Sequence, residues 1–167
     1  GTEGQVVGSL VEKTAARDDI ELVTIGLPEF DLSDAGKIAP AIEALRPEMI
    51  LSVAAYTAVD AAESDEATAL AVNGVALGEI GRAATQLGVP VAHLSTDYVF
   101  DGAKSDPYVE TDPTGPIGAY GRSKLAGEQA LAAATANHAI LRTAWVYSPF
   151  GKNFVKTMLR LAETRDR

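Results

Sequence analysis

The sequence predicts an α/β fold built on a doubly wound parallel sheet, with helices on both faces. Short β-branched runs alternate with longer alanine-rich stretches of helical period, the pattern typical of repeated βα units. The composition, with 47% hydrophobic and 22% charged residues, indicates a globular protein with a substantial core. The length of 167 residues suits one domain, or a domain plus the start of another.

The predicted strands are short apolar runs that end near small or turn-forming residues, as buried parallel strands do. They cover residues 20–25, 49–54, 91–95 and 139–142. Apolar residues at three- and four-residue spacing predict helices between them. These helices cover residues 5–16, 41–46, a pair within 65–87, then 120–134 and 153–163.

Proline and glycine mark two of the helix ends. Pro40 is expected in the first turn of the short second helix, where a missing backbone amide costs nothing. The sequence Leu87-Gly88-Val89-Pro90 predicts a helix end, a turn and the entry to a strand, because glycine tolerates positive φ and proline forbids further helix.

The charge and residue usage exclude several classes of protein. The net charge of −9, with basic residues scattered apart from Arg160, Arg165 and Arg167, argues against nucleic acid as a partner. The absence of cysteine excludes a disulfide scaffold, a thiolate zinc site and a cysteine nucleophile, and it fits a reducing compartment. No apolar run approaches the roughly 20 residues that span a bilayer, and the start lacks the pattern of a signal peptide. We therefore expect a cytoplasmic protein with no membrane partner.

Three local patterns suggest carbonyl reduction with a dinucleotide. Glycines precede the first helix, where backbone amides can approach a pyrophosphate. Tyr120 and Lys124 lie four residues apart on one helix face, and the ammonium is expected to lower the pKa of the phenol, which can then protonate a carbonyl that accepts hydride. Ser95 or Thr96, at the end of a strand, can hold the carbonyl oxygen.

Structural explanations stay open for each pattern. The glycines are also typical of a flexible terminus, and the Tyr–Lys pair is also typical of a solvated helix face. The hydroxyl at the strand end could instead form a turn or a cap. The loop after the third predicted strand carries Asp101, Asp106, Glu110 and Asp112, but without the spacing of a calcium loop. We interpret these carboxylates as a solvated loop and assign no metal ligands, although a loop of this length is usually functional.

The patterns together resemble the extended short-chain dehydrogenase/reductases, the superfamily of NAD-dependent epimerases and dehydratases, and within it the family of dTDP-4-dehydrorhamnose reductases. The segments 1–6 (GTEGQV), 54–63 (AAYTAVDAAE) and 95–102 (STDYVFDG) are similar to its nucleotide loop, cofactor segment and hydroxyl-bearing strand end. The segment 116–128, with Tyr120-Gly-Arg-Ser-Lys124, resembles its catalytic helix, and residues 142–159 resemble its substrate-facing end. The resemblance covers essentially the whole chain.

The resemblance implies a Rossmann-like NAD(P)-binding domain over residues 1–167. It implies that the 4-keto group of dTDP-4-dehydro-L-rhamnose is reduced by NADPH or NADH to give dTDP-L-rhamnose. Tyr120 would be the proton donor, and Lys124 would orient the nicotinamide ribose and tune Tyr120. Thr96 would bond the keto oxygen of the sugar.

Further binding residues follow from the same resemblance. Besides Tyr120 and Lys124, the residues implied to contact the cofactor are Gly4, Gln5, Val6, Asp31, Leu32, Ala55, Tyr56 and Thr57, and those implied to contact the sugar nucleotide are Thr96, Asp97 and Trp145. Structural roles remain open: Tyr56 could pack against a helix, Trp145 could anchor the core and Asp31 could cap a turn. Asn73 matches an asparagine common in the family, with a supporting or a purely structural role.

Several questions stay open at this stage. Residues 25–29 offer neither an acidic nor a basic side chain placed to distinguish NAD from NADP. The resemblance allows Mg²⁺ and a homodimer. The family's first strand would precede Gly1 and its C-terminal substrate region would follow Arg167, so we expect an excerpt of a longer chain. The alternatives are another epimerase or dehydratase of this fold, or a non-catalytic NADP-binding subunit like that of methionine adenosyltransferase.

Overall fold

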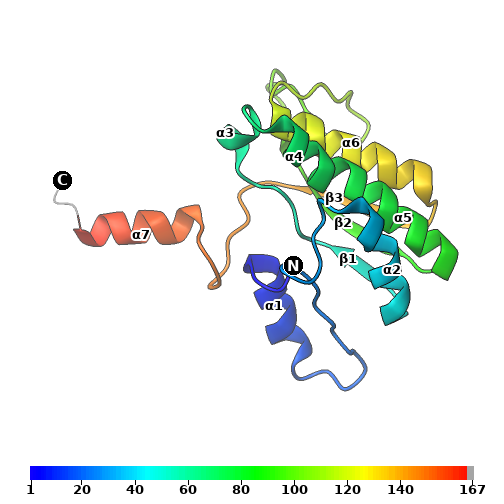
Figure 1. Ribbon diagram of the computed structural model, residues 1–167. Helices are drawn as coiled ribbons and strands as arrows, with labels where there is room; N and C mark the ends of the chain where they lie inside the picture. Colours follow the sequence, from blue (N-terminus) through cyan, green and yellow to red (C-terminus); the bar gives the residue numbers. More distant parts are fainter. Residues whose placement is uncertain (165–167) are drawn as a thin grey trace. The chain divides into compact units, whose positions relative to one another are not determined.

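The computed structural model describes residues 1–164, and the chain forms two compact units (Figure 1). The larger unit is Phe30–Thr143. The smaller unit combines Gly1–Glu29 with the chain from Ala144 onward. Of the predicted basic group, Arg165 and Arg167 lie outside the described residues.

The larger unit is built on a parallel sheet with β2 (Val91–Thr96) at its centre. On either side lie β1 (Ile50–Ser52) and β3 (His138–Thr143), with Ile50 and His138 both in register with Val91. The carboxyl ends of parallel strands meet at one edge of a sheet, so β2 delivers Ser95 and Thr96 to the edge where α/β folds bind ligands. The predicted parallel α/β class is confirmed, and three of the four predicted strands are present.

Helices flank this sheet. In chain order they are α2 (Ala35–Leu45), α3 (Val59–Ala62), α4 (Glu66–Leu70), the π-helical turn η1 (Ala71–Val75), α5 (Ala76–Leu87), the 3₁₀ turn η2 (Asp97–Val99) and α6 (Ala119–Ala134). Helices α5 and α6 lie side by side, and α2 packs on α5 (Figure 1). They enclose the main apolar core, which includes Ile38, Ile42, Leu77, Ile80, Val91 and Leu131. Within residues 1–164, none of the helices is both long and apolar enough to traverse a bilayer.

The predicted helix pair within residues 65–87 is one continuous run with a wide turn in its middle. The amide of Ala76 donates to the carbonyl of Ala71, five residues earlier, which makes η1 a π-helical turn. The run ends as predicted at Gly88, whose φ of +72° is left-handed, with the Val89 amide donating to the Ala84 carbonyl at 3.0 Å.

The predicted position of Pro40 is wrong. Helix α2 begins at Ala35, so Pro40 lies inside it rather than in its first turn. Ile38 and Ile42 are both buried, and their four-residue spacing places them on one face toward the core. Packing of Ile38 therefore favours helix upstream of the proline. The ring costs only the bond to the carbonyl of Gly36, close to the start of the helix.

The smaller unit holds α1 (Gln5–Thr14) and α7 (Phe154–Thr164). The strand predicted at residues 20–25 is not formed. Ile20 and Val23 are 42% and 55% exposed. An apolar run becomes a strand only when a second strand satisfies its amides and carbonyls, and no described residue supplies one.

Candidate active site

Helix α6 carries Tyr120 and Lys124 one turn apart, and its N-terminus is held firmly. The carboxylate of Glu63, which follows α3, accepts a hydrogen bond from the Ala119 amide at 2.7 Å. A Cβ at Gly121 would collide with the carbonyl of Tyr98, so glycine is what lets α6 approach the end of β2. The two predicted catalytic side chains therefore start from a fixed backbone.

Lys124 is buried against β2, with only 2% of its surface exposed. Its Nζ donates to the carbonyl of Leu94 at 2.7 Å and lies 3.0 Å from Nε2 of His93. Burial lowers the pKa of Lys124 to about 8, while the negative charge of Glu128 acts in the opposite direction. Glu128 in turn is paired with Arg142 of β3, at 2.6 Å.

His93 is fully buried in the middle of β2, and the sequence analysis gave it no role. Its Nδ1 lies 3.1 Å from the carbonyl oxygen and 3.2 Å from Oγ of Ser52 on β1. Burial first, and then the charge of Lys124, lower its pKa to about 4, so the ring is neutral near pH 7. Because the Lys124 ammonium can only donate, we assign the ring proton to Nδ1, which donates to the Ser52 carbonyl. The only sequence signal for a role of His93 was its position as a lone histidine inside an apolar strand.

The pKa of Tyr120 is raised, not lowered as the sequence predicted. Burial is the main cause, a hydrogen bond with the Thr96 side chain acts against it, and the charge of Asp97 raises the pKa further. The expected lowering fails because the Lys124 ammonium is directed to His93 and the Leu94 carbonyl. At neutral pH the phenol is therefore protonated, which is the state that a proton donor requires.

Thr96 lies at the carboxyl end of β2 and is 5% exposed. Its Oγ1 donates to Oδ1 of Asp97 at 3.1 Å and accepts from the Tyr98 amide at 3.2 Å. The second bond is the turn or cap contact that the sequence offered as an alternative role for this hydroxyl. The Thr96 hydroxyl lies close enough to the Tyr120 phenol to lower the pKa of that phenol, against the larger effect of burial. Next to it, the buried Oγ of Ser95 has no hydrogen-bond partner among the described residues. The structure thus places Thr96 beside Tyr120, with Lys124 one turn farther along α6 and its ammonium against β2.

Asn73 lies in the wide turn η1 and ties the segment after β1 to α6. Its Oδ1 accepts from the Tyr56 amide at 2.8 Å, and its Nδ2 donates to the Tyr56 carbonyl at 3.1 Å and to Ser123 Oγ at 3.0 Å. Ser123 Oγ donates to the carbonyl of Tyr120 at 2.8 Å. The side chain of Asn73 therefore supports the Tyr120 backbone through one intermediate residue.

Other predicted cofactor residues of the larger unit also have structural partners. The ring of Tyr56 packs with that of Tyr120 against a small cluster of Ala62, Ala69 and Ala119, whereas Thr57 is exposed and Ala55 half-buried. Oδ1 of Asp31 accepts from the Ser33 amide at 2.8 Å, the expected turn contact, and Leu32 packs on the main core.

In the smaller unit, the three residues predicted to meet the dinucleotide open α1. Gly4 has a φ of +129°, which suits only glycine. The amide of Gln5 is engaged with the segment before α7: Nε2 donates to the Val146 carbonyl at 3.2 Å and Oε1 accepts from Asn153 at 2.9 Å. Val6 is half-buried.

Trp145 is not the core anchor that the sequence analysis left open, since 75% of its surface is exposed. Its φ of +53° is left-handed, a strained conformation for a bulky residue. The indole lies edge-on to Phe154, with ring centres 5.0 Å apart. These two rings, with Tyr147 and Val155, line an apolar pocket of the smaller unit.

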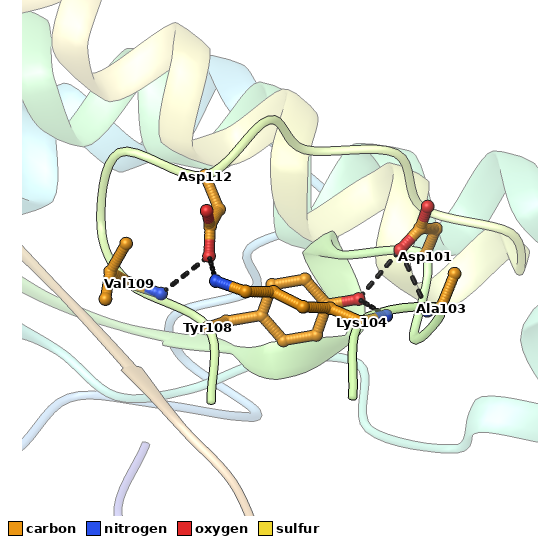
Figure 2. A network of polar contacts seen from close by, with 6 residues as sticks. All are labelled: Asp101, Ala103, Lys104, Tyr108, Val109 and Asp112. Carbon is orange, nitrogen blue, oxygen red and sulfur yellow. Dashed lines mark hydrogen bonds and ion pairs between the residues drawn. The ribbon is translucent and has the colours of Figure 1, made fainter. Parts of the chain in front are cut away.

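Two acidic side chains of the loop between η2 and α6 organise the loop itself (Figure 2). Asp101 Oδ1 accepts from the Tyr108 hydroxyl at 2.7 Å, and Asp112 Oδ2 accepts from Lys104 Nζ at 2.6 Å and the Val109 amide at 2.9 Å. In the part of the chain that the structure describes, no three His, Asp or Glu side chains are grouped to hold a metal ion.

Comparison with known proteins finds reductases over nearly the full chain. A curated relative from Sinorhizobium fredii, named dTDP-4-dehydrorhamnose reductase, is 57% identical over 99% of this chain and 55% of its own length. The relative of the same name from Escherichia coli is 42% identical over 99% of this chain and 56% of its own length. The chain thus spans little more than half the length of these relatives.

Solved structures agree with this result. A dTDP-4-dehydrorhamnose reductase from Clostridium acetobutylicum has a TM-score of 0.93 at 33% identity, covering 99% of this chain and 59% of its own. The reductase from Bacillus anthracis, in complex with NADP, has a TM-score of 0.93 at 32% identity with the same coverage. The model of the RmlD substrate binding domain matches residues 1–167. The chain therefore belongs to the RmlD substrate binding domain family.

Proposed function

We propose that the protein carrying this chain reduces the 4-keto group of dTDP-4-dehydro-L-rhamnose to a hydroxyl, giving dTDP-L-rhamnose, with NADPH or NADH as the hydride donor. The observation that carries the proposal is the position of Thr96 beside Tyr120 at the carboxyl end of β2, with the buried Lys124 one turn farther along α6. The names of the relatives that match 99% of the chain support the choice of substrate.

Tyr120 and Thr96 supply the acid half of the reaction. When bound, the reduced nicotinamide supplies a hydride to the carbonyl carbon. The oxygen gains negative charge as the carbonyl bond opens, and the phenol of Tyr120 gives it a proton. The Thr96 hydroxyl, by turning its single proton from Asp97 Oδ1 to the same oxygen, stabilises that charge. The raised pKa of Tyr120 keeps its proton in place until the oxygen becomes basic enough to take it.

Lys124 fits the role of holding a ribose. An ammonium has three protons, and described residues accept two of them, at His93 and at the carbonyl of Leu94. The third is available to a ribose hydroxyl.

The remaining contacts are assigned on the family resemblance. We assign the cofactor to Gly4, Gln5, Val6, Asp31, Leu32, Ala55, Tyr56 and Thr57 in addition to Tyr120 and Lys124. We assign the sugar nucleotide to Asp97, which is exposed beside Thr96, and to Trp145. The exposed indole and strained backbone of Trp145 support a binding role, because strain of this kind collects at functional sites. Mg²⁺, a homodimer and a cytoplasmic location stay predictions.

The deciding experiment is an assay of the full-length protein with enzymatically prepared dTDP-4-dehydro-L-rhamnose. The oxidation of NADPH and of NADH is followed separately, and the product is identified by mass spectrometry and NMR. Formation of dTDP-L-rhamnose supports the proposal, and the two rates give the cofactor preference. Reaction only with another sugar nucleotide indicates a different enzyme of this fold, and cofactor binding without turnover indicates a non-catalytic subunit; either result overturns the proposal.

A further inference from the structure

A buried polar line runs across the sheet from α6 to β1. It begins at Lys124 Nζ, passes 3.0 Å to Nε2 of His93, and continues from Nδ1 over 3.1 Å to the carbonyl of Ser52. His93 is 0% exposed and Ser52 is 7% exposed. A buried imidazole costs free energy unless both ring nitrogens are hydrogen-bonded, and both are bonded here.

We propose that His93 is a positioning residue of the active site, whose neutral ring, fixed by Ser52, holds the Lys124 ammonium against β2 without cancelling its charge. This inference rests on the proposed function, since it gives Lys124 its direction. The carbonyl of Ser52 can only accept a hydrogen bond, so it selects the tautomer with the proton on Nδ1. The lone pair of Nε2 then faces Lys124.

The neutrality of this acceptor matters for the chemistry. A carboxylate in the place of His93 would also hold the ammonium, but it would offset the positive charge that strengthens a hydrogen bond to a ribose hydroxyl. Glu128, the carboxylate on the next turn of α6, is drawn away by Arg142, which donates to its two oxygens at 3.0 and 2.6 Å. The ammonium is therefore bound by two neutral groups, a carbonyl and an imidazole.

The charged and titratable groups around Lys124 come from each neighbouring element. His93 faces it from β2, and Glu128 faces it from its own helix with Arg142 of β3 behind. Tyr120 lies one turn earlier on α6. Removing the hydrogen bond that His93 Nε2 accepts from the charged form favours the neutral amine, so the pKa of Lys124 should fall below its value of about 8.

The test compares His93→Phe, which removes the acceptor, with His93→Gln, which retains an acceptor oxygen, in the full-length protein. His138→Phe is the matched control, because the other histidine of the chain is half-buried at the start of β3 and contacts the Thr135 carbonyl. We expect His93→Phe to lower kcat about tenfold or more, with a smaller change in KM for the sugar nucleotide. The alkaline limb of the kcat profile should move to lower pH. His93→Gln should recover much of both effects, and His138→Phe should match the wild type.

A second readout does not depend on turnover. Nitrogen-15 NMR of the wild type should show His93 protonated on Nδ1 and neutral from about pH 5 to pH 8. The Lys124 Nζ titration, assigned with Lys124→Met, should shift to lower pH in His93→Phe. A proton on Nε2, or an unchanged Nζ titration in folded His93→Phe, overturns the inference. If the wild type does not reduce the sugar nucleotide, the proposed function fails, and the Nζ titration still decides the role of His93.

Discussion

Burial, rather than a neighbouring charge, sets the protonation state of Tyr120. The phenol sits at the start of α6 against the end of β2, and its raised pKa leaves it protonated at neutral pH. The proton is released only when a stronger base, the developing alkoxide of a reduced carbonyl, is placed beside it. Tyr120 is thus suited to act as an acid, and Lys124 does not set its protonation state.

Tyr120→Phe removes this acid and little else, because the ring and its packing against Ala62, Ala69 and Ala119 remain. We expect kcat for the 4-keto sugar nucleotide to fall by at least about 100-fold. The affinity for NADPH or NADH, measured by fluorescence titration of the same preparation, should stay within about twofold, since Lys124 is untouched. Turnover comparable to wild type would show that another group donates the proton.

Sequence reasoning found Tyr120, Lys124 and Thr96 because each belongs to a local pattern. It missed His93 and the carbonyl of Leu94 because their partner Lys124 is about 30 residues away along the chain. For the same reason it gave the wrong direction for the pKa of Tyr120. A four-residue spacing places two side chains on one helix face, but it does not say which acceptors on a facing strand will draw the ammonium away.

At the scale of elements, α6 serves both the site and the core. Its first two turns carry Tyr120 and Lys124, and the helix also packs on the continuous run of α4, η1 and α5. The contact is close at Gly127, where a Cβ would collide with the carbonyl of Asn73 in η1. A glycine that weakens a helix on its own is here the residue that lets two helices meet.

Gly127→Ala should therefore destabilise the protein by about 1–3 kcal/mol, the range typical of overpacking a core. Gly78→Ala in α5 is the matched control, because its nearest neighbour would be the Cβ of Ala130 at an ordinary 3.5 Å. Helix propensity predicts that this control is stabilised, by up to about 1 kcal/mol. Urea unfolding of the two variants gives both values, and equal stability of the two would contradict the close contact.

The ion pair between α6 and β3 is a second link at this scale. Glu128→Gln leaves the half-buried Arg142 without a counter-charge, at an expected cost of about 2 kcal/mol. The control is Glu66→Gln, which breaks the more exposed pair with Arg122 and should leave the unfolding midpoint unchanged. Thermal and urea unfolding check both variants. A midpoint for Glu128→Gln that matches the wild type would mean that the pair contributes no net stability.

The helices and strands could be predicted where the residues of the segment itself determine its structure. The three observed strands and the end of α5 at Gly88 follow from apolar runs and turn residues. The segment 20–25 has the same pattern but no partner strand among the described residues, and a strand is a property of two segments. Helix α2 begins earlier than predicted because burial of Ile38, a tertiary effect, outweighs the signal of Pro40.

At the scale of the whole molecule, the buried His93 makes stability depend on pH. The pKa of His93 is about 4 in the folded protein and near 6.5 when unfolded. Between these values the unfolded state binds a proton that the folded state does not, so lowering the pH favours unfolding. At neutral pH and above, His93 is neutral in both the folded and the unfolded protein, so it does not reduce the free energy of unfolding there.

Wild type should therefore lose stability relative to His93→Gln as the pH falls from about 6.5 to about 4, by up to about 3 kcal/mol. The measurement is the free energy of unfolding of both proteins in urea at several pH values across this range. Taking the difference cancels the carboxylates that the two proteins share. Parallel stability curves would show that His93 is protonated in the folded state or exposed to solvent.

The π-helical turn η1 also sets how α4 and α5 are rotated relative to each other about the helix axis. A π turn accommodates one residue more than an α turn, so α4 and α5 are offset by about 100° from the relation that an unbroken helix would impose. The offset lets one run of chain present Asn73 to Tyr56 and Ser123 while Leu77 and Ile80 point into the main core. An unbroken α-helix of the same residues would rotate one of these two faces by about 100° away from its partners. The π-helical turn thus lets one helical run match two surfaces, the polar contacts of Asn73 and the apolar core contacts of α5, that a regular helix could not face together.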